Sequence, residues 1–247
     1  MSLSQCHIIV MSLSRYHKLK SYQLTYEPIF CALGEGIHED SLYDPTGWDR
    51  FRETFDTEGV MNLFMLIDRL PNEQEVAKGH KLINFYAGSL DNINSNITEE
   101  NLQGMVDYFT DGSFLYSSRK TLDYLREYGV TVYQYIFTYT GGNCAACNAG
   151  HPNLGVSHFE EVQFLWYSDS NDNQNINNHD VMELMTTAWT NFAKTGNPSP
   201  PGSNFVWTPQ SNNDQIQYLN ISGPNPIMQS NQLIQDRMEF WDIILNE

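Results

Sequence analysis

The stretch Val130–Tyr139, VTVYQYIFTY, decides the fold class of this chain. β-branched and aromatic residues occupy most of its positions, which predicts a central β-strand. The helical pattern before it, SRKTLDYLREYG (residues 118–129), ends at Gly129, a typical residue just past a helix C-terminus. A loop rich in glycine and asparagine follows the strand. A buried strand that directly follows a helix indicates a mixed α/β architecture.

Working outward from this strand, short apolar runs alternate with long amphipathic helical patterns. The predicted strands are EPIFCALGEG (residues 27–36) and QIQYLNIS (215–222), and the predicted helices include 97–111, which Thr98 would cap, 179–196 and 231–246. This alternation predicts an α/β fold whose sheet is covered by helices on both faces. Three strands are too few for so many helices, so the chain is expected to be part of a larger sheet protein.

The composition of the 247-residue chain excludes several function classes. With 40% hydrophobic residues it can bury the core of one large domain or two small ones. Its formal net charge of −17 argues against a nucleic-acid partner, because phosphate binding needs clustered Lys and Arg. The acidic residues are spread along the chain, which fits a solvated surface or the steering of a cationic ligand. No stretch is long and apolar enough for a transmembrane helix.

Residues 1–25 form an atypical N-terminal segment, because their apolar patch precedes the basic residues. This order does not match a signal peptide, and the domain itself is expected to span residues 26–247. The sequences Asn96-Ile97-Thr98 and Asn220-Ile221-Ser222 match the N-glycosylation pattern. A chain this rich in asparagine produces such matches by chance, so by themselves they indicate little about its compartment.

Two of the four cysteines, Cys144 and Cys147, form a CxxC pair in the loop sequence GGNCAACNAG. A zinc ribbon would need a second such pair, and the chain has none. A thioredoxin-type pair would open a helix directly after a strand, whereas this pair lies in a Gly- and Asn-rich loop. We therefore expect a local loop disulfide or two free thiols, and neither a metal nor a cofactor.

Several segments, in the same order along the chain, resemble the type-B carboxylesterase and cholinesterase family of the α/β-hydrolase fold, and arthropod esterases in particular. The resemblance covers residues 26 to 245 and therefore does not rest on one motif. The matching pieces include EPIFCALGEG (27–36), NLGVSHFEEVQFLW (153–166), AWTNFAKTGNPSP (188–200) and RMEFWDIIL (237–245). These four pieces correspond, in the same order, to four segments of the family. They are the strand that ends in DEG or SEG, the catalytic-histidine segment GxxHGDELPYLF, the segment WxxFAKTGNPNP and the closing helix.

The resemblance implies roles for two residues in the hydrolysis of a small-molecule carboxylic ester. His158 would be the general base that takes the proton of a nucleophilic serine, and Glu35 the acid that orients it. Histidine suits this role because it titrates near neutral pH. Glu161 matches the structural acid of the family's HGDE segment, with a loop-anchoring hydrogen bond or proton sharing with Glu160 as the alternatives. Trp189, Phe192, Trp207 and Trp241 are expected in the core.

The chain also departs from the family pattern. It contains no G-x-S-x-G nucleophile elbow and no HGGG-type oxyanion stretch, both of which belong to the family's N-terminal half. The near match at Ser157 has Phe159 where the elbow needs glycine, and it lies on the histidine loop, so Ser157 is rejected as the nucleophile. The chain is therefore expected to form the C-terminal part of the α/β-hydrolase sheet together with the helices that cover it.

This departure leaves two function classes open. The first is an ester hydrolase fragment with the acid and base of a Ser-Glu-His triad, inactive by itself, whose partner is the missing N-terminal half or a second copy in a homodimer. The second is a pseudo-esterase or a neuroligin-like binding and adhesion module. The family's members are often secreted or membrane-associated, whereas the sequence of this chain shows no signal peptide and gives no location of its own.

Overall fold

The computed structural model of the 247-residue chain describes residues 10–13, 45–63, 69–148, 152–157, 160–166, 176–210, 216–230 and 232–246. Contacts divide the chain into two compact units. Unit 1 comprises Met1–Thr25 and Ser117–Asp236, and unit 2 comprises Tyr26–Tyr116 and Arg237–Glu247. The strand expected at residues 27–36 lies outside the described residues.

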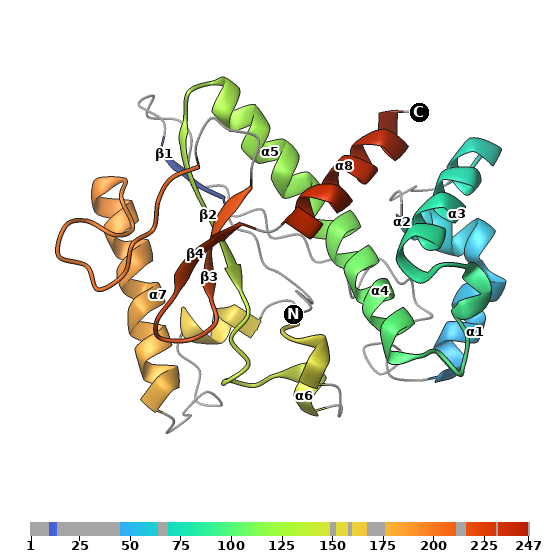
Figure 1. The fold of residues 1–247 in the computed structure, drawn as a ribbon, viewed down its shortest axis with the longest axis horizontal. Coiled ribbons are helices and arrows are strands. Elements are labelled where there is room, and N and C mark those ends of the chain that lie inside the picture. Colours follow the sequence, from blue (N-terminus) through green and yellow to red (C-terminus); the bar gives the residue numbers. More distant parts are fainter. Residues whose placement is uncertain are drawn as a thin grey trace. The chain divides into compact units, whose positions relative to one another are not determined.

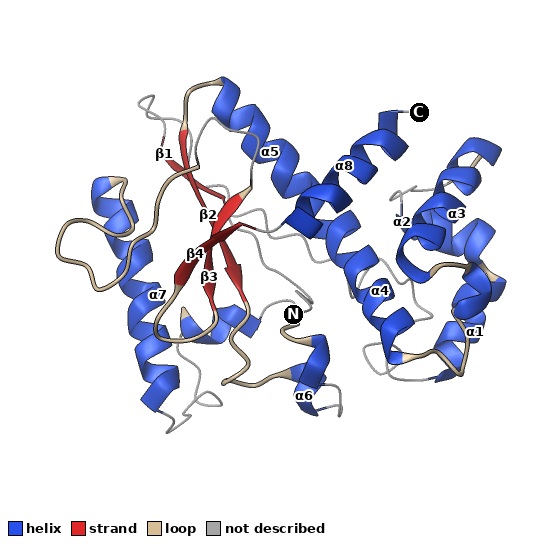
Figure 2. Ribbon diagram, in the orientation of Figure 1, coloured by secondary structure: helices blue, strands red, loops and turns tan. Residues whose placement is uncertain are grey.

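Unit 1 is built around a four-stranded mixed sheet, drawn in red in Figure 2. The strands stand in the order β1 (Val10–Leu13), β2 (Thr131–Phe137), β3 (Gln217–Ile221) and β4 (Ile227–Ser230). β2 and β3 are parallel, whereas the β1–β2 and β3–β4 pairs are antiparallel. The expectation that residues 130–139 form a central strand is confirmed, because β2 has a neighbour on each side.

Two strands of this sheet were not expected from the sequence. β1 comes from the N-terminal segment, whose composition did not indicate a strand. β4 is short, follows Pro224 and Pro226, and carries two polar residues among its four, so neither its length nor its alternation marks it as a strand. β4 forms because a tight connection after β3 returns the chain antiparallel to it, with Leu219 opposite Met228.

The side chains of β2 alternate between the two faces of the sheet. Tyr133, Tyr135 and Phe137 belong to one apolar cluster with Leu219 and residues of α7 (Ile176–Thr195). In Figure 1, α7 lies on one side of the sheet and α5 (Tyr116–Glu127) on the other. The prediction of a sheet with helices on both sides is therefore confirmed.

The expected core positions of the aromatic residues are also confirmed. Phe192, Trp207 and Trp241 are buried, and Trp189 packs partly buried against the cluster of unit 1. The indole N–H of Trp207 donates a hydrogen bond of 3.0 Å to the carbonyl of Gln134. This bond satisfies the polar end of a buried indole while its ring fills the core.

Glycines end two helices of unit 1 where the sequence predicted. Gly129, after α5, has φ +66°, and Gly196, after α7, has φ +76°. A left-handed conformation at these positions favours glycine because it has no Cβ. The remaining helical elements of unit 1 are α6 (Ala145–Asn148) and the 3₁₀ turns η6 (Pro152–Leu154) and η7 (Glu160–Phe164).

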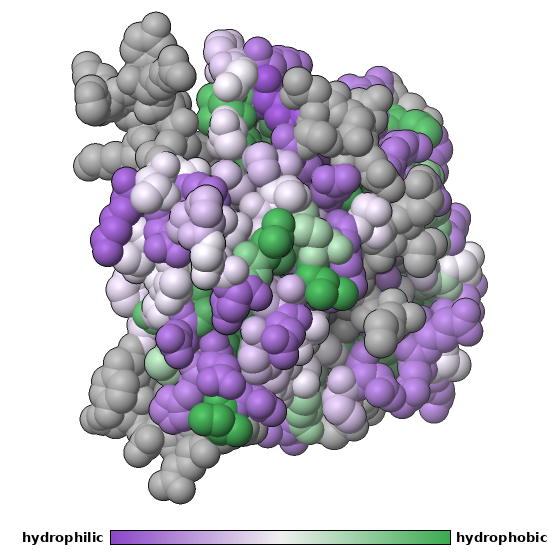
Figure 3. Space-filling model, turned by 60° about the vertical axis from the view of Figure 1, so that its left-hand side comes forward, coloured by the Kyte–Doolittle hydropathy of each residue, from purple (hydrophilic) through white to green (hydrophobic). Residues whose placement is uncertain are grey.

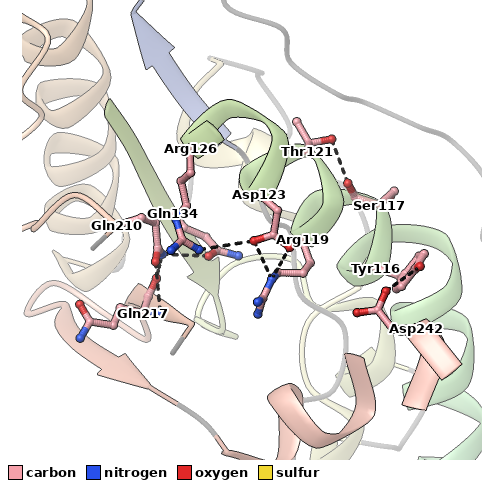
Figure 4. Close-up of polar contacts among 10 residues, drawn as sticks. All are labelled: Tyr116, Ser117, Arg119, Thr121, Asp123, Arg126, Gln134, Gln210, Gln217 and Asp242. Atoms are coloured by element: carbon pink, nitrogen blue, oxygen red, sulfur yellow. Dashed lines mark hydrogen bonds and ion pairs between the residues drawn. The ribbon is translucent and has the colours of Figure 1, made fainter. Parts of the chain in front are cut away.

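A glutamine also joins the strands of unit 1 at the start of β2 (Figure 4). The side-chain amide nitrogen of Gln210 donates to the side-chain oxygen of Gln134 (3.0 Å) and to the carbonyl of Gln217. The backbone N–H of Gln210 donates to the carbonyl of Val132 at 2.8 Å. These bonds fix the segment that follows Trp207 against the sheet.

All the secondary-structure elements described in unit 2 are helical. Its buried residues include a row of aromatic rings that contact edge to face, from Trp48 through Phe51 to Phe55 and Phe109. The elements are α1 (Pro45–Glu53), the π-helical turn η3 (Phe55–Gly59), α2 (Val60–Leu63), α3 (Glu73–Ala87), η4 (Leu90–Asn92), α4 (Glu99–Thr110), the π-helical turn η5 (Asp111–Leu115) and α8 (Gln232–Asn246), which begins in unit 1.

The crossing of α3 and α4 depends on a glycine. A Cβ on Gly104 would lie 2.1 Å from the carbonyl oxygen of Tyr86, so a larger residue would push the two helices apart. The side chain of Thr98 accepts a hydrogen bond from the backbone N–H of Asn101, which confirms Thr98 as the N-cap of α4.

The exposed surface agrees with the composition. Hydrophilic residues cover most of the described surface on the face in Figure 3, and hydrophobic patches on it are small. No helix among the described residues is both long enough and apolar enough to cross a membrane.

Candidate active site

The two residues expected to be catalytic, Glu35 and His158, lie outside the described residues. The structure does describe the chain on both sides of position 158, namely residues 152–157 and 160–166. Both segments belong to unit 1 and follow the carboxyl end of β2. They show how this part of the chain is fixed to the sheet.

The exit from β2 is held by two polar side chains. The backbone N–H of Thr138 donates to the carbonyl of Ile221 at 2.9 Å, and its hydroxyl donates to the side-chain oxygen of Asn220 at 2.7 Å. The hydroxyl of Tyr139 donates to the side-chain oxygen of Asn178 in α7 at 2.8 Å. The chain therefore leaves the sheet in a defined direction, tied to β3 and to α7.

A short disulfide-closed loop comes next. Cys144 and Cys147 form a disulfide across α6, and Cys144 is buried. The expectation of a local loop disulfide is confirmed, and the alternative of two free thiols is wrong in this structure. The disulfide closes residues 144–147 into a ring, which stiffens the loop between β2 and the segment that contains position 158.

The side chain of Gln163 joins this loop to the segment after position 158. Its amide oxygen accepts from the backbone N–H of Asn143 at 2.7 Å. Its amide nitrogen donates to the carbonyl of Asn143 at 3.4 Å and to that of Glu160 at 2.7 Å. Gly142 permits this approach, because a Cβ there would lie 2.3 Å from the Gln163 amide oxygen. One amide thus connects three backbone groups of two segments.

Buried residues fix the chain on each side of position 158. On the N-terminal side, Gly155 turns the chain with φ +84°, and Val156 inserts into the core of unit 1. On the C-terminal side, Glu160 is buried and its backbone N–H donates to the carbonyl of Ser157 at 3.3 Å. Position 158 therefore lies between two fixed positions, each two residues away.

Burial also perturbs the carboxyl group of Glu161. Desolvation raises the pKa of Glu161 to about 7, and the nearby Glu160 carboxylate adds a smaller rise. Burial raises the pKa of the Tyr135 phenol, and the charge of the Glu161 carboxylate adds to this rise. Glu161 is 3% exposed, so this residue is part of the buried interior of unit 1 and not of the surface of segment 160–166.

A groove in unit 1 lies elsewhere, and no described histidine lines it. Its volume is about 690 Å³, and it lies between α7 and the residues Pro200–Phe205. Asp180, Glu183, Thr187 and Ser203 line it, but no histidine does. Among the described residues, its hydroxyl groups therefore have no imidazole beside them to act as the base of a Ser-acid-His triad. Among the described residues, no group of three or more His, Cys, Asp or Glu side chains could hold a metal ion.

A buried ion-pair cluster in unit 2 was not found by sequence reasoning. The guanidinium of Arg237 in α8 contacts Asp107 at 2.6 Å and Asp111 at 2.7 Å, and the Tyr86 hydroxyl donates to Asp111 at 2.5 Å. The indole N–H of Trp241 donates to the Tyr86 oxygen at 2.8 Å. No local pattern marks this cluster, because Arg237 and Trp241 lie more than 100 residues from their partners in sequence. It binds α8 to α3 and α4.

Comparison with known proteins identifies relatives of this chain. The family model described as the carboxylesterase family matches residues 35–241. Carboxylesterase 4A of Bos taurus is 28% identical over 139 residues, which is 56% of this chain and 24% of that protein. Juvenile hormone esterase of Tribolium castaneum is 28% identical over 154 residues, 59% of this chain and 26% of that protein.

A solved structure gives the same result for the fold. The crystal structure of juvenile hormone esterase from Manduca sexta, with OTFP covalently attached, superposes with a TM-score of 0.62 at 20% sequence identity. The match covers 81% of this chain and 37% of that one. The chain thus has part of an α/β-hydrolase fold, and its matches cover about a quarter of the length of carboxylesterase 4A and of juvenile hormone esterase. Since the family model matches most of its residues, the chain belongs to the carboxylesterase family.

Proposed function

We propose that this chain is the acid- and base-carrying part of a serine carboxylic ester hydrolase that acts on a small-molecule ester. His158 is the general base, and Glu35 is the acid that orients it. One observation in the structure supports this proposal above the others. The chain is fixed to the sheet on both sides of position 158, through Val156 on one side and through Glu160 and Gln163 on the other. A base must be held in a defined geometry to act on a nucleophile.

The chemistry assigns a distinct task to each group. A serine hydroxyl attacks the ester carbonyl while the imidazole of His158 takes its proton, and the same imidazole then returns that proton to the leaving alcohol. The Glu35 carboxylate fixes the tautomer of the ring and stabilises its protonated form. In this fold the groups follow the order serine, acid, histidine along the chain, and Glu35 precedes His158.

The nucleophile must come from outside this sequence, because no G-x-S-x-G segment is present in it. We therefore propose that the chain is inactive alone and active when joined to an N-terminal half that supplies the elbow and the oxyanion hole. Loss of both removes the covalent route itself rather than a fraction of the rate.

The test uses p-nitrophenyl acetate as substrate. The purified chain should hydrolyse it no faster than a His158→Ala variant, which controls for weak catalysis by an exposed imidazole. The N-terminal half of a family relative, carrying the family's GESAGG segment, is then added or fused in front. Turnover should appear and should be lost in His158→Ala and Glu35→Gln. His179→Ala is the matched control, because His179 is an exposed residue of α7, and it should retain full turnover.

A serine-directed fluorophosphonate distinguishes the remaining outcomes. Labelling of the added half that depends on His158 supports the proposal. Strong turnover by the chain alone, blocked by the same reagent, would refute the claim that it carries no nucleophile. A complex of the two halves that neither turns over substrate nor takes the label would refute the esterase role and would favour a binding module or pseudo-esterase.

A further inference from the structure

The two N-glycosylation sequences of this chain, at Asn96 and Asn220, are equivalent in sequence but not in structure. The acceptor pattern requires asparagine followed by any residue except proline and then serine or threonine, and both sites satisfy it. The transferring enzyme must also reach the side-chain amide nitrogen of the asparagine. The structure separates the two sites on this second requirement.

Asn220 lies inside the sheet of unit 1, on β3 between β2 and β4. Its residue pairs with Ile136 on one side and with Ile227 on the other, and it is 9% exposed. Its amide nitrogen donates to the side-chain oxygen of Gln229 at 3.2 Å, and its amide oxygen accepts from Thr138 at 2.7 Å. A glycan at this nitrogen would break these bonds and require β3 to separate from its neighbours.

Asn96 lies on the surface of unit 2, in the turn between η4 and α4. The residue is exposed, and its side-chain amide makes no hydrogen bond with any described residue. The turn itself is well fixed: the backbone N–H of Asn96 donates to the Asn94 side chain at 2.8 Å, and that of Ile97 donates to the Asn94 carbonyl at 2.9 Å. Asn96 therefore presents a free amide on an ordered turn.

The Cys144–Cys147 disulfide points independently to an oxidising compartment. Disulfides persist mainly in secreted proteins and in the secretory pathway, where N-glycosylation also takes place. This bond closes a loop in unit 1 and has no part in either acceptor sequence. It therefore adds a second observation, from a different part of the chain, that supports exposure to the glycosylation machinery.

We propose that Asn96 carries an N-linked oligosaccharide and that Asn220 does not. The donor is an oligosaccharide linked to a lipid through pyrophosphate. A bond forms between the amide nitrogen of Asn96 and the anomeric carbon of the first sugar, while the bond from that carbon to the pyrophosphate oxygen breaks. The lipid pyrophosphate leaves, and the amide nitrogen loses one proton to a base of the enzyme. No oxidation or reduction is involved.

The hydroxyl of Thr98 has two roles in this proposal. It completes the acceptor sequence, and it caps α4 by accepting from the N–H of Asn101 at 3.2 Å. The substitutions Thr98→Ser and Thr98→Asp separate these roles. Both keep a good N-cap, because serine and aspartate are preferred there, but only serine keeps the acceptor sequence.

The test expresses the full chain behind a cleavable secretory leader in eukaryotic cells. A C-terminal tag with its own acceptor sequence shows that the chain entered the compartment. Intact mass is measured before and after peptide N-glycosidase, which converts a glycosylated asparagine to aspartate, and peptide mapping locates that aspartate. We expect one glycan besides that of the tag, at Asn96. It should be lost in Asn96→Gln and Thr98→Asp, and it should persist in Thr98→Ser and Asn220→Gln.

Two results would overturn the proposal. The first is a chain whose tag is glycosylated while Asn96 remains unmodified. The second is a glycan at Asn220, which would mean that β3 does not protect its amide from the enzyme. Circular dichroism of Thr98→Asp is the control for folding. A spectrum equal to that of the wild type means that the loss of the Asn96 glycan results from the changed acceptor sequence and not from misfolding.

Discussion

Replacement of Arg237 by methionine should strongly destabilise unit 2. Methionine keeps much of the length of the arginine side chain but removes the guanidinium group, whose Nη1 lies 2.6 Å from Asp107 and whose Nε lies 2.7 Å from Asp111. Two carboxyl groups would then face each other without a cation. The Asp111 side chain is 0% exposed and that of Asp107 is 19% exposed, so water cannot replace the lost contacts at Asp111.

The magnitude follows from the cost of an uncompensated buried charge. Removing one partner of a buried ion pair costs about 3–5 kcal/mol, and we expect a loss in this range at pH 8.5. Burial already raises the pKa of Asp111 to about 7 in the presence of Arg237. Without the guanidinium this pKa should rise further, because the main opposing influence has been removed.

The sign of the pH dependence follows from this raised pKa. The folded state retains a proton on Asp111 that the unfolded state has released, so the stability from this group is full below about pH 4 and is lost as pH rises towards 7. Below pH 7 both wild type and variant carry a neutral Asp111, and the cost of Arg237→Met should be smaller. Above pH 7 only the wild-type carboxylate has its cation, so the cost should grow by up to about 1.4 kcal/mol per pH unit.

The assay is urea unfolding at pH 6.0 and pH 8.5, followed by tryptophan fluorescence. Trp241 is a suitable reporter because it donates to Tyr86, the hydroxyl partner of Asp111. The double variant Arg237→Met with Asp111→Asn removes the uncompensated charge and should recover part of the loss at pH 8.5.

The matched control is Arg119→Met, whose partner Asp123 is 35% exposed and lies four residues away in α5 (Figure 4). Such a surface pair contributes less than about 1 kcal/mol. Equal and small losses for Arg237→Met and Arg119→Met, without pH dependence, would refute the reasoning.

Three further predictions concern the segment around position 158. Gln163→Ala should lower the free energy of unfolding by about 1–3 kcal/mol, because the backbone N–H of Asn143 and two carbonyls lose their hydrogen-bond partner. Urea unfolding measures this loss, and hydrogen exchange at the Asn143 amide should become faster. Reduction of the Cys144–Cys147 disulfide should speed proteolytic cleavage within the loop, measured by limited proteolysis with and without dithiothreitol; an unchanged cleavage rate would contradict the stiffening role. Because the pKa of Glu161 is raised to about 7, the stability that this group contributes is lost as pH rises from about 4 to 7. Glu161→Gln should therefore flatten the dependence of the urea midpoint on pH in this range. The same pH dependence in wild type and variant would show that Glu161 is not the group responsible.

The sequence predicted those parts of the fold that rest on local rules. The β-branched run of β2, the Thr98 cap of α4 and the glycine stops after α5 and α7 all follow from backbone preferences within a few residues. The family was also readable from sequence, because several motifs occur in the right order. The proposed roles of Glu35 and His158 rest on that resemblance and stay predictions, since both residues lie outside the described part of the chain.

Only the tertiary structure decided which residues meet across long separations. Arg237 and Asp107 are 130 positions apart, and Gln163 reaches Asn143 across 20, yet neither pair carries a local signal. β4 was missed because a short strand next to prolines forms only when β3 supplies its hydrogen-bond partners. The sequence likewise treats Asn96 and Asn220 alike, because the acceptor pattern is three residues long. Their difference arises from burial and hydrogen bonding, which are properties of the neighbours that folding brings together.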